Sequence, residues 1–172
     1  MNNYIFLLFA TLLVATLIDL KLHRIPNILS LGLVATGLFF QIYAKGFYGL
    51  WTGTSGVLVG LIGFLPFYLG GGMGAGDVKL MAAVGTFLGP MNTLLAACLT
   101  LITGGVMALM ILIARKGAGA FLQRYGQMLR HLLATGQAVY IPPQPGDAAA
   151  SRFPYAAAIT VGTFATLIWQ AP

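Results

Sequence analysis

Two of the three acidic residues in this chain, Asp19 and Asp77, lie in or beside apolar segments. A carboxylate inside a membrane span is costly, so a residue of this kind is a functional candidate from the outset. The third acid, Asp147, follows Pro142–Pro145 and is predicted to be a solvated loop residue. The chain contains no Glu, so any carboxylate chemistry would depend on Asp19 and Asp77.

The placement of these two aspartates suits a shared proton. Asp19 ends a predicted helix, where the dipole disfavours an anion, whereas Asp77 begins one, where the dipole favours an anion. If the two carboxyl groups meet, they should share one proton and titrate as a unit. Such a pair can hydrolyse a peptide, because one carboxylate takes a proton from water and the other carboxyl donates one to the substrate. The dipole argument assigns the base to Asp77 and the acid to Asp19.

Simpler roles for the same residues stay open. Asp77 could cap its own helix, and Asp19 could pair with Lys21 or Arg24 at the membrane surface. Five glycines occupy the seven positions 70–76, and they will not propagate a helix. They either only break the helix or also let an extended substrate backbone approach Asp77 closely.

The composition excludes a soluble domain. Hydrophobic residues make up 59% of the chain and charged residues 7%, with a mean hydropathy of +0.90, whereas a soluble domain carries roughly 25% charged residues. The net charge of +6 is expected to set orientation in a membrane, and no nucleic-acid partner is expected. Cys98 is the only cysteine and is predicted to be a small buried apolar residue.

Hydropathy and helix-breaking residues predict an all-α transmembrane bundle of about six spans, the fourth of them short. We expect a single membrane domain over residues 1–172, with a cytoplasmic amphipathic segment at about 115–152 that contains a basic interfacial helix at 117–137. Pro26 suits the first position of the second span, and Tyr155 and Trp169 are predicted interfacial anchors. The expected spans are 4–20, 28–44, 52–69, 77–88, 91–114 and 153–169.

The basic residues predict the orientation of these spans. If the 21–27 loop is cytoplasmic, Lys45 is the only basic residue on the outer side of the membrane. Both termini then also lie on the outer side. Asp19 and Asp77 then share the cytoplasmic level. The basic residues expected inside are Lys21, Arg24, Lys79, Arg115, Lys116, Arg124, Arg130 and Arg152.

Three segments resemble motifs of the type IV prepilin peptidase family of membrane aspartic proteases. Residues 19–27, which read Asp-Leu-Lys-Leu-His-Arg-Ile-Pro-Asn, are similar to that family's pattern of Asp, a basic stretch and Ile-Pro-Asn. Residues 74–79, Gly-Ala-Gly-Asp-Val-Lys, resemble its Gly-x-Gly-Asp signature. Residues 154–159, which begin Pro-Tyr, are a weaker match to the start of its last helix.

The resemblance implies that Asp19 and Asp77 are the catalytic pair of a prepilin leader peptidase in the bacterial cytoplasmic membrane. Its substrate would be a prepilin, with a basic leader and a hydrophobic helix, cut at the cytoplasmic face. The pilus assembly machinery is a second candidate partner beside the lipid bilayer, and no cofactor and no metal are expected. The residues that would support the motifs or bind substrate are Pro26, Asn27, Gly74, Gly76 and Lys79.

The start of the chain favours one branch of that family. Its first span begins at once and the paired CxxC motifs of longer members are absent, so the chain resembles the short tight-adherence (Flp-type) branch without methyltransferase activity. Two other readings stay open. Paired intramembrane acids also serve as proton relays in transporters and channels, and an inactive relative could act as a pilus-assembly subunit.

Overall fold

The chain folds into helices, and no strand occurs among the residues described here. The computed structural model describes residues 3–22, 24–114, 117–137, 139 and 154–169. Asp147, the loop at 142–147 and the basic residues Arg115, Lys116 and Arg152 lie outside these ranges. The helices are α1 (Asn3–Leu22), α2 (Asn27–Leu69), α3 (Ala75–Leu88), α4 (Pro90–Ala114), α5 (Ala118–Thr135) and α6 (Tyr155–Trp169), which confirms the predicted all-α fold.

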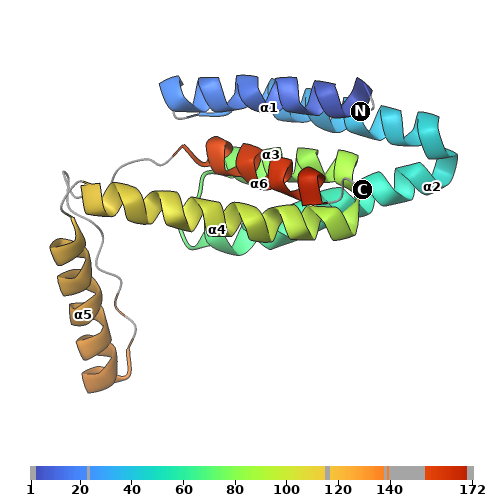
Figure 1. The fold of residues 1–172 in the computed structure, drawn as a ribbon. Coiled ribbons are helices and arrows are strands. Elements are labelled where there is room, and N and C mark those ends of the chain that lie inside the picture. The colour runs from blue at the N-terminus through green and yellow to red at the C-terminus, as the bar shows by residue number, and fades with distance from the viewer. Residues whose placement is uncertain (1–2, 23, 115–116, 138, 140–153, 170–172) are drawn as a thin grey trace. The chain divides into compact units, whose positions relative to one another are not determined.

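Within the described residues, three helices have the length and apolar composition needed to cross a bilayer: α1, α2 and α4. α6 is apolar but shorter. α2 is far longer than one crossing requires, and it folds back on itself at Gly46, where φ is 57° and ψ is −137°. A positive φ of this kind suits glycine. The two arms of α2 therefore correspond to the second and third predicted spans (Figure 1).

Pro26 precedes α2 instead of occupying its first helical position. Its φ is −61° and its ψ is 133°, which is extended backbone. Its carbonyl accepts hydrogen bonds from the N–H groups of Leu29 at 3.1 Å and Ser30 at 3.4 Å. The predicted position was thus wrong by one residue, because Pro26 acts as the N-cap.

The chain divides into two compact units. Unit 1 comprises Met1–Gly104 and Pro154–Pro172, and unit 2 comprises Gly105–Phe153. Unit 2 holds the end of α4 and the whole of α5, which stops at Gly136 with a left-handed φ of 70°. The expectation of one membrane domain over the whole chain stays a prediction.

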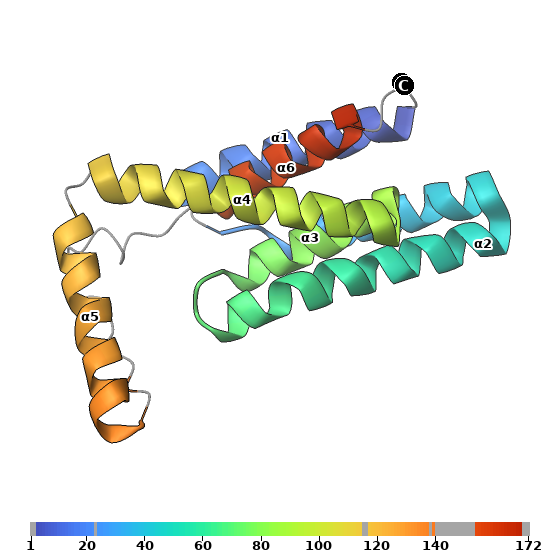
Figure 2. The same ribbon diagram turned by 60° about the horizontal axis from the view of Figure 1, so that its bottom comes forward.

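The short helix α3 lies at the centre of unit 1. Almost every side chain from Asp77 to Phe87 is buried, and both arms of α2 press against the helix (Figure 2). Gly56 of the second arm meets Gly85 of α3 backbone to backbone, so that a Cβ on either would collide with the other's carbonyl. Gly37 of the first arm leaves room for Thr86 in the same way. Small residues thus allow the close helix contacts that stabilise bundles in lipid.

α6 runs antiparallel to both α1 and α4. The hydroxyl groups of Thr16 in α1 and Thr160 in α6 lie 2.8 Å apart, and Thr103 of α4 donates to the carbonyl of Ala158 at 3.4 Å. At one end of unit 1, on the left of Figure 1, α1 ends, α2 and α6 begin, and the loop joins α2 to α3. The bend of α2 lies at the opposite end. Every predicted site residue belongs to the first of these ends.

Candidate active site

Asp19 lies in the last turn of α1 and its side chain is only 6% exposed. Its Oδ2 accepts a hydrogen bond from the backbone N–H of Ala156 at 3.2 Å. Ala156 is the second residue of α6, so the carboxylate faces the positive end of that helix dipole. Lys21 and Arg24, the residues with which Asp19 could pair at the membrane surface, are both exposed. Asp19 itself is buried.

Asp77 is the third residue of α3 and is 8% exposed. Its Oδ2 accepts the N–H of Gly74 at 3.1 Å, and its own N–H donates to the carbonyl of Gly74 at 3.1 Å. Asp77 therefore does cap its own helix, as the simpler reading supposed. This cap engages one oxygen of the carboxylate and fixes the side chain at the helix start.

The structure places both buried aspartates at the same end of unit 1. They are close enough for their charges to interact. Each of them also accepts a backbone N–H at the start of a helix. The start of α6 offsets the unfavourable end of α1 beside Asp19. The helix dipoles therefore do not show which aspartate is the acid and which is the base. The catalytic roles of Asp19 and Asp77 stay predictions.

The Ile-Pro-Asn segment packs on the first turns of α3. Lys79 Nζ donates to Asn27 Oδ1 at 2.9 Å, which joins the second motif to the first. A Cβ on Gly76 would lie 3.1 Å from Ile25 Cβ, so Gly76 permits the close approach of this segment. The two motifs thus contact each other through Asn27, Gly76 and Lys79, beside the N-cap residue Pro26. The sequence did not predict this contact between the motifs.

The glycine run has structural tasks of its own. Gly71 has a φ of +74° and turns the chain between α2 and α3. Gly74 carries no side chain where a Cβ would lie 3.1 Å from Asp77 Oδ2, which lets the carboxylate reach the backbone. The proposed approach of a substrate backbone to Asp77 stays a prediction.

Tyr155 is a neighbour of the pair that the sequence analysis missed. Its half-buried ring packs edge-to-face on Phe64, with the ring centroids 6.5 Å apart, and its hydroxyl lies against Gly104. Tyr155 therefore packs inside the bundle next to Ala156, whose N–H binds Asp19, and its role as an interfacial anchor stays a prediction. The Pro-Tyr resemblance at 154–155 was the one available signal.

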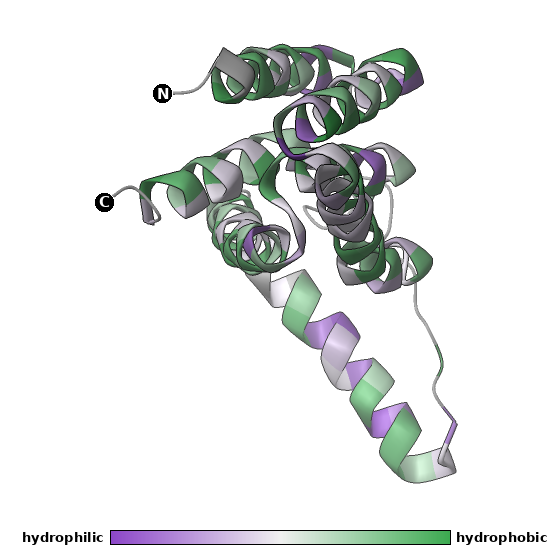
Figure 3. Ribbon diagram, turned by 90° about the vertical axis from the view of Figure 1, so that its right-hand side faces the viewer, coloured by the Kyte–Doolittle hydropathy of each residue, from purple (hydrophilic) through white to green (hydrophobic). Residues whose placement is uncertain are grey.

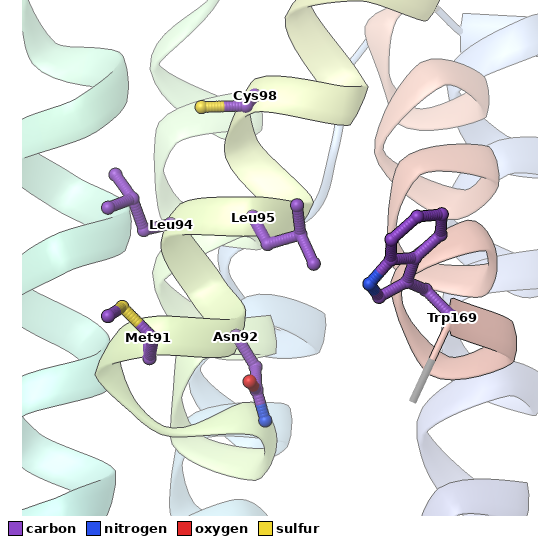
Figure 4. A pocket seen from close by; sticks show the side chains of 6 residues that line it. All are labelled: Met91, Asn92, Leu94, Leu95, Cys98 and Trp169. Atoms are coloured by element: carbon purple, nitrogen blue, oxygen red, sulfur yellow. The ribbon is translucent and has the colours of Figure 1, made fainter. Parts of the chain in front are cut away.

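An open hollow lies elsewhere in unit 1. It is an open apolar cavity of about 620 Å³ between the first half of α4 and the end of α6, and it contains no predicted site residue (Figure 4). Cys98 is exposed at this hollow, so the prediction that it is buried was wrong. Among the residues described, no three His, Cys, Asp or Glu side chains gather as metal ligands would. The hollow is lined by Met91, Asn92, Leu94, Leu95, Cys98 and Trp169.

The chain is similar in sequence to a known protein family and to a named bacterial protein. The model of the type IV leader peptidase family matches residues 6–109, a range that includes both aspartates and ends within α4. A protein of Escherichia coli O78:H11 (strain H10407 / ETEC), named type 4 prepilin-like proteins leader peptide-processing enzyme, is 33% identical over 109 residues. That match covers 57% of this chain and 40% of the relative's length. No solved structure matches the chain.

Proposed function

The chain belongs to the type IV leader peptidase family, and from this premise we propose that it is a membrane-embedded aspartic endopeptidase that removes prepilin leaders. One observation carries the proposal. Two buried aspartates, Asp19 from α1 and Asp77 from α3, lie within reach of each other's charge at one end of the bundle. Buried acids with interacting charges are unfavourable for stability alone, which supports a chemical role for them.

In the proposed reaction the pair acts on one water molecule. One carboxylate accepts a proton from the water, whose oxygen then attacks the scissile carbonyl, and the other carboxyl donates its proton to the substrate. The fixed N–H donors of Gly74 and Ala156 hold one oxygen of each carboxyl group. Preorganised side chains of this kind need no rearrangement during the reaction.

The proposed substrate is a prepilin with a short basic leader followed by a hydrophobic helix. The relative from Escherichia coli is named for processing leader peptides of type 4 prepilin-like proteins, which supports this substrate class. The predicted concentration of basic residues at the end of the bundle that holds the pair favours cleavage at the cytoplasmic face of the inner membrane. Within the class we propose Flp-type pilins.

The test is co-expression with a Flp-type prepilin in a bacterium that lacks its own prepilin peptidases. Asp19→Asn and Asp77→Asn keep the size of each side chain, and the amide introduced at position 77 retains an oxygen that can accept the N–H of Gly74. Asp147→Asn is the matched control, because it changes the one remaining acid of the chain. N-terminal sequencing of the recovered pilin reports whether the leader has been removed.

The expected result is loss of cleavage in both site variants and full cleavage with Asp147→Asn. Removing an acid or base of this type should slow the reaction at least about 100-fold. Equal amounts of membrane-inserted protein must accompany the loss, since a misfolded variant would also be inactive. Wild-type cleavage by either site variant would exclude the dyad.

A further inference from the structure

The surface of α5 in unit 2 has an exposed apolar stripe. Along this helix the apolar residues recur at helical spacing, and the alternation of green and purple segments is visible in Figure 3. Leu122 is 69% exposed, Leu129 56% and Leu133 78%. No other helix of unit 2 covers them within the described residues. The stripe comprises Phe121, Leu122, Tyr125, Met128, Leu129, Leu132 and Leu133.

The remaining face of α5 is polar and basic. It carries Gln123, Arg124, Gln127, Arg130 and His131, and the helix has no acidic residue. The Arg124 guanidinium carbon lies 5.2 Å from the centroid of the Tyr125 ring and 6.0 Å from that of Phe121. This contact holds a positive charge at the boundary between the apolar and the polar face.

The chain itself brings α5 to a membrane surface. α4 is long and apolar enough to cross a bilayer and ends at Ala114, and α5 begins at Ala118. Three intervening residues span at most about 11 Å, so α5 would begin close to the lipid headgroups if α4 crosses the bilayer. Two of these three residues, Arg115 and Lys116, are basic in the sequence.

We propose that α5 lies flat in the membrane interface, with its apolar stripe in the lipid and its arginines on anionic phospholipid headgroups. An amphipathic helix with a basic face inserts its apolar side about 5–10 Å into the headgroup and acyl-chain boundary. Basic residues near the surface are attracted by anionic lipids. An anionic lipid surface is the partner that fits a helix with no acidic residue and with Arg124 at the boundary between its two faces. The role of α5 in the interface is independent of the proposed peptidase activity.

The experiment places one spin label on each face of α5 in the full-length protein. Cys98→Ser removes the only native cysteine, and Leu129→Cys or Gln127→Cys then supplies a single labelling site. These positions are two residues apart and face opposite sides, because each residue turns the helix by about 100°. The protein is reconstituted in vesicles of phosphatidylcholine, with or without phosphatidylglycerol. Collision with oxygen reports lipid exposure, and collision with a water-soluble nickel complex reports water exposure.

The label at position 129 is expected to collide mainly with oxygen, and the label at 127 mainly with nickel. Phosphatidylglycerol should deepen the label at 129, and the double variant Arg124→Gln/Arg130→Gln should abolish that gain. Raising the ionic strength from about 0.1 M to about 1 M should reverse it too, because the Debye length falls from about 10 Å to about 3 Å. Equal water exposure of both labels would overturn the proposal. So would shielding of position 129 from both reagents, since that would show a protein partner on the stripe, and so would the same depth in both lipid mixtures.

Discussion

At the residue scale, each aspartate of the pair is held by a backbone N–H at the start of a helix. Asp77 reaches back to Gly74 of its own loop, whereas Asp19 crosses from α1 to Ala156 of α6. These bonds compensate part of the cost of burying a carboxylate, because hydrogen bonds to a charged group contribute about 1.5–3 kcal/mol each. The two helix starts therefore help to keep both acids buried at the same end of the bundle.

Gly74 should be needed for a full cleavage rate, because any larger residue would place a Cβ beside the Asp77 carboxylate. In Gly74→Ala the new Cβ would lie 3.1 Å from Asp77 Oδ2, which would displace the carboxylate. In the proposed catalytic role of Asp77, displacing its carboxylate by a fraction of an ångström is expected to lower the cleavage rate about tenfold or more. Gly72→Ala is the control, since its Cβ would make only an ordinary contact at 3.6 Å with the Phe67 carbonyl. Equal rates for the two variants in a prepilin cleavage assay would contradict this role.

The hydrogen bond between Lys79 and Asn27 should couple the two motifs. Lys79→Met and Asn27→Ala each remove the bond, so the double variant should lose less stability than the sum of the single losses. The expected coupling is about 0.5–1 kcal/mol, because the pair is exposed. Reversible unfolding in mixed micelles measures it. Lys45→Met, a change of another exposed lysine, should show no coupling with Asn27→Ala, and strictly additive losses for the first pair would refute the link.

At the scale of elements, the boundaries of the helices follow from local sequence. Apolar runs of sufficient length, separated by Gly70–Gly74 and by Gly89–Pro90, predicted α1, α3, α4, α5 and α6 within a few residues. The bend at Gly46 falls in the gap between the predicted spans 28–44 and 52–69. Local patterns of hydropathy and helix breakers therefore sufficed for the fold class and the element order.

Contacts between elements could not be predicted in this way. The bond from Ala156 to Asp19 joins opposite ends of the chain, and a single sequence carries no signal for such a pair. The environment of Asp19 was judged from α1 alone, so the start of α6 beside it was missed. The packing of the Tyr155 ring on Phe64 could not be predicted for the same reason.

The glycine contact between α2 and α3 should control the stability of the bundle. Gly85→Ala and Gly56→Ala would each push a Cβ into the backbone of the facing helix. We expect each to lower the free energy of unfolding by about 1–3 kcal/mol. Gly63→Ala is the control, because its nearest neighbour would be Ala97 Cβ at an ordinary 3.9 Å. Thermal unfolding in detergent checks this, and unchanged midpoints for Gly56→Ala and Gly85→Ala would contradict the packing.

At the scale of the whole molecule, orientation in the membrane decides which substrates reach the pair. In unit 1 the end of α1 and the start of α3, which carry the aspartates, lie opposite the bend of α2 (Figure 1). The basic residues favour the aspartate end as the cytoplasmic one. A cytoplasmic site would meet a prepilin whose leader has not crossed the membrane, which fits the proposed reaction.

Cysteine labelling tests that orientation. In the Cys98→Ser background, Lys45→Cys and Arg24→Cys place single thiols at exposed positions at opposite ends of unit 1. A membrane-impermeant maleimide applied to spheroplasts should label position 45, and it should label position 24 only after the membrane has been opened. The positive-inside asymmetry is the physical reason for this expectation. Labelling of position 24 in intact spheroplasts would reverse the topology.

The central claim is that Asp19 and Asp77 hydrolyse the leader as one unit. The most direct measurement is the single-turnover cleavage rate of a purified prepilin by the reconstituted protein, for wild type, Asp19→Asn, Asp77→Asn and the double variant. Each single change is expected to slow cleavage at least about 100-fold, and the double change should slow it no further, because residues that act together do not contribute additively. Losses that multiply in the double variant, or a single variant that keeps the wild-type rate, would contradict the claim.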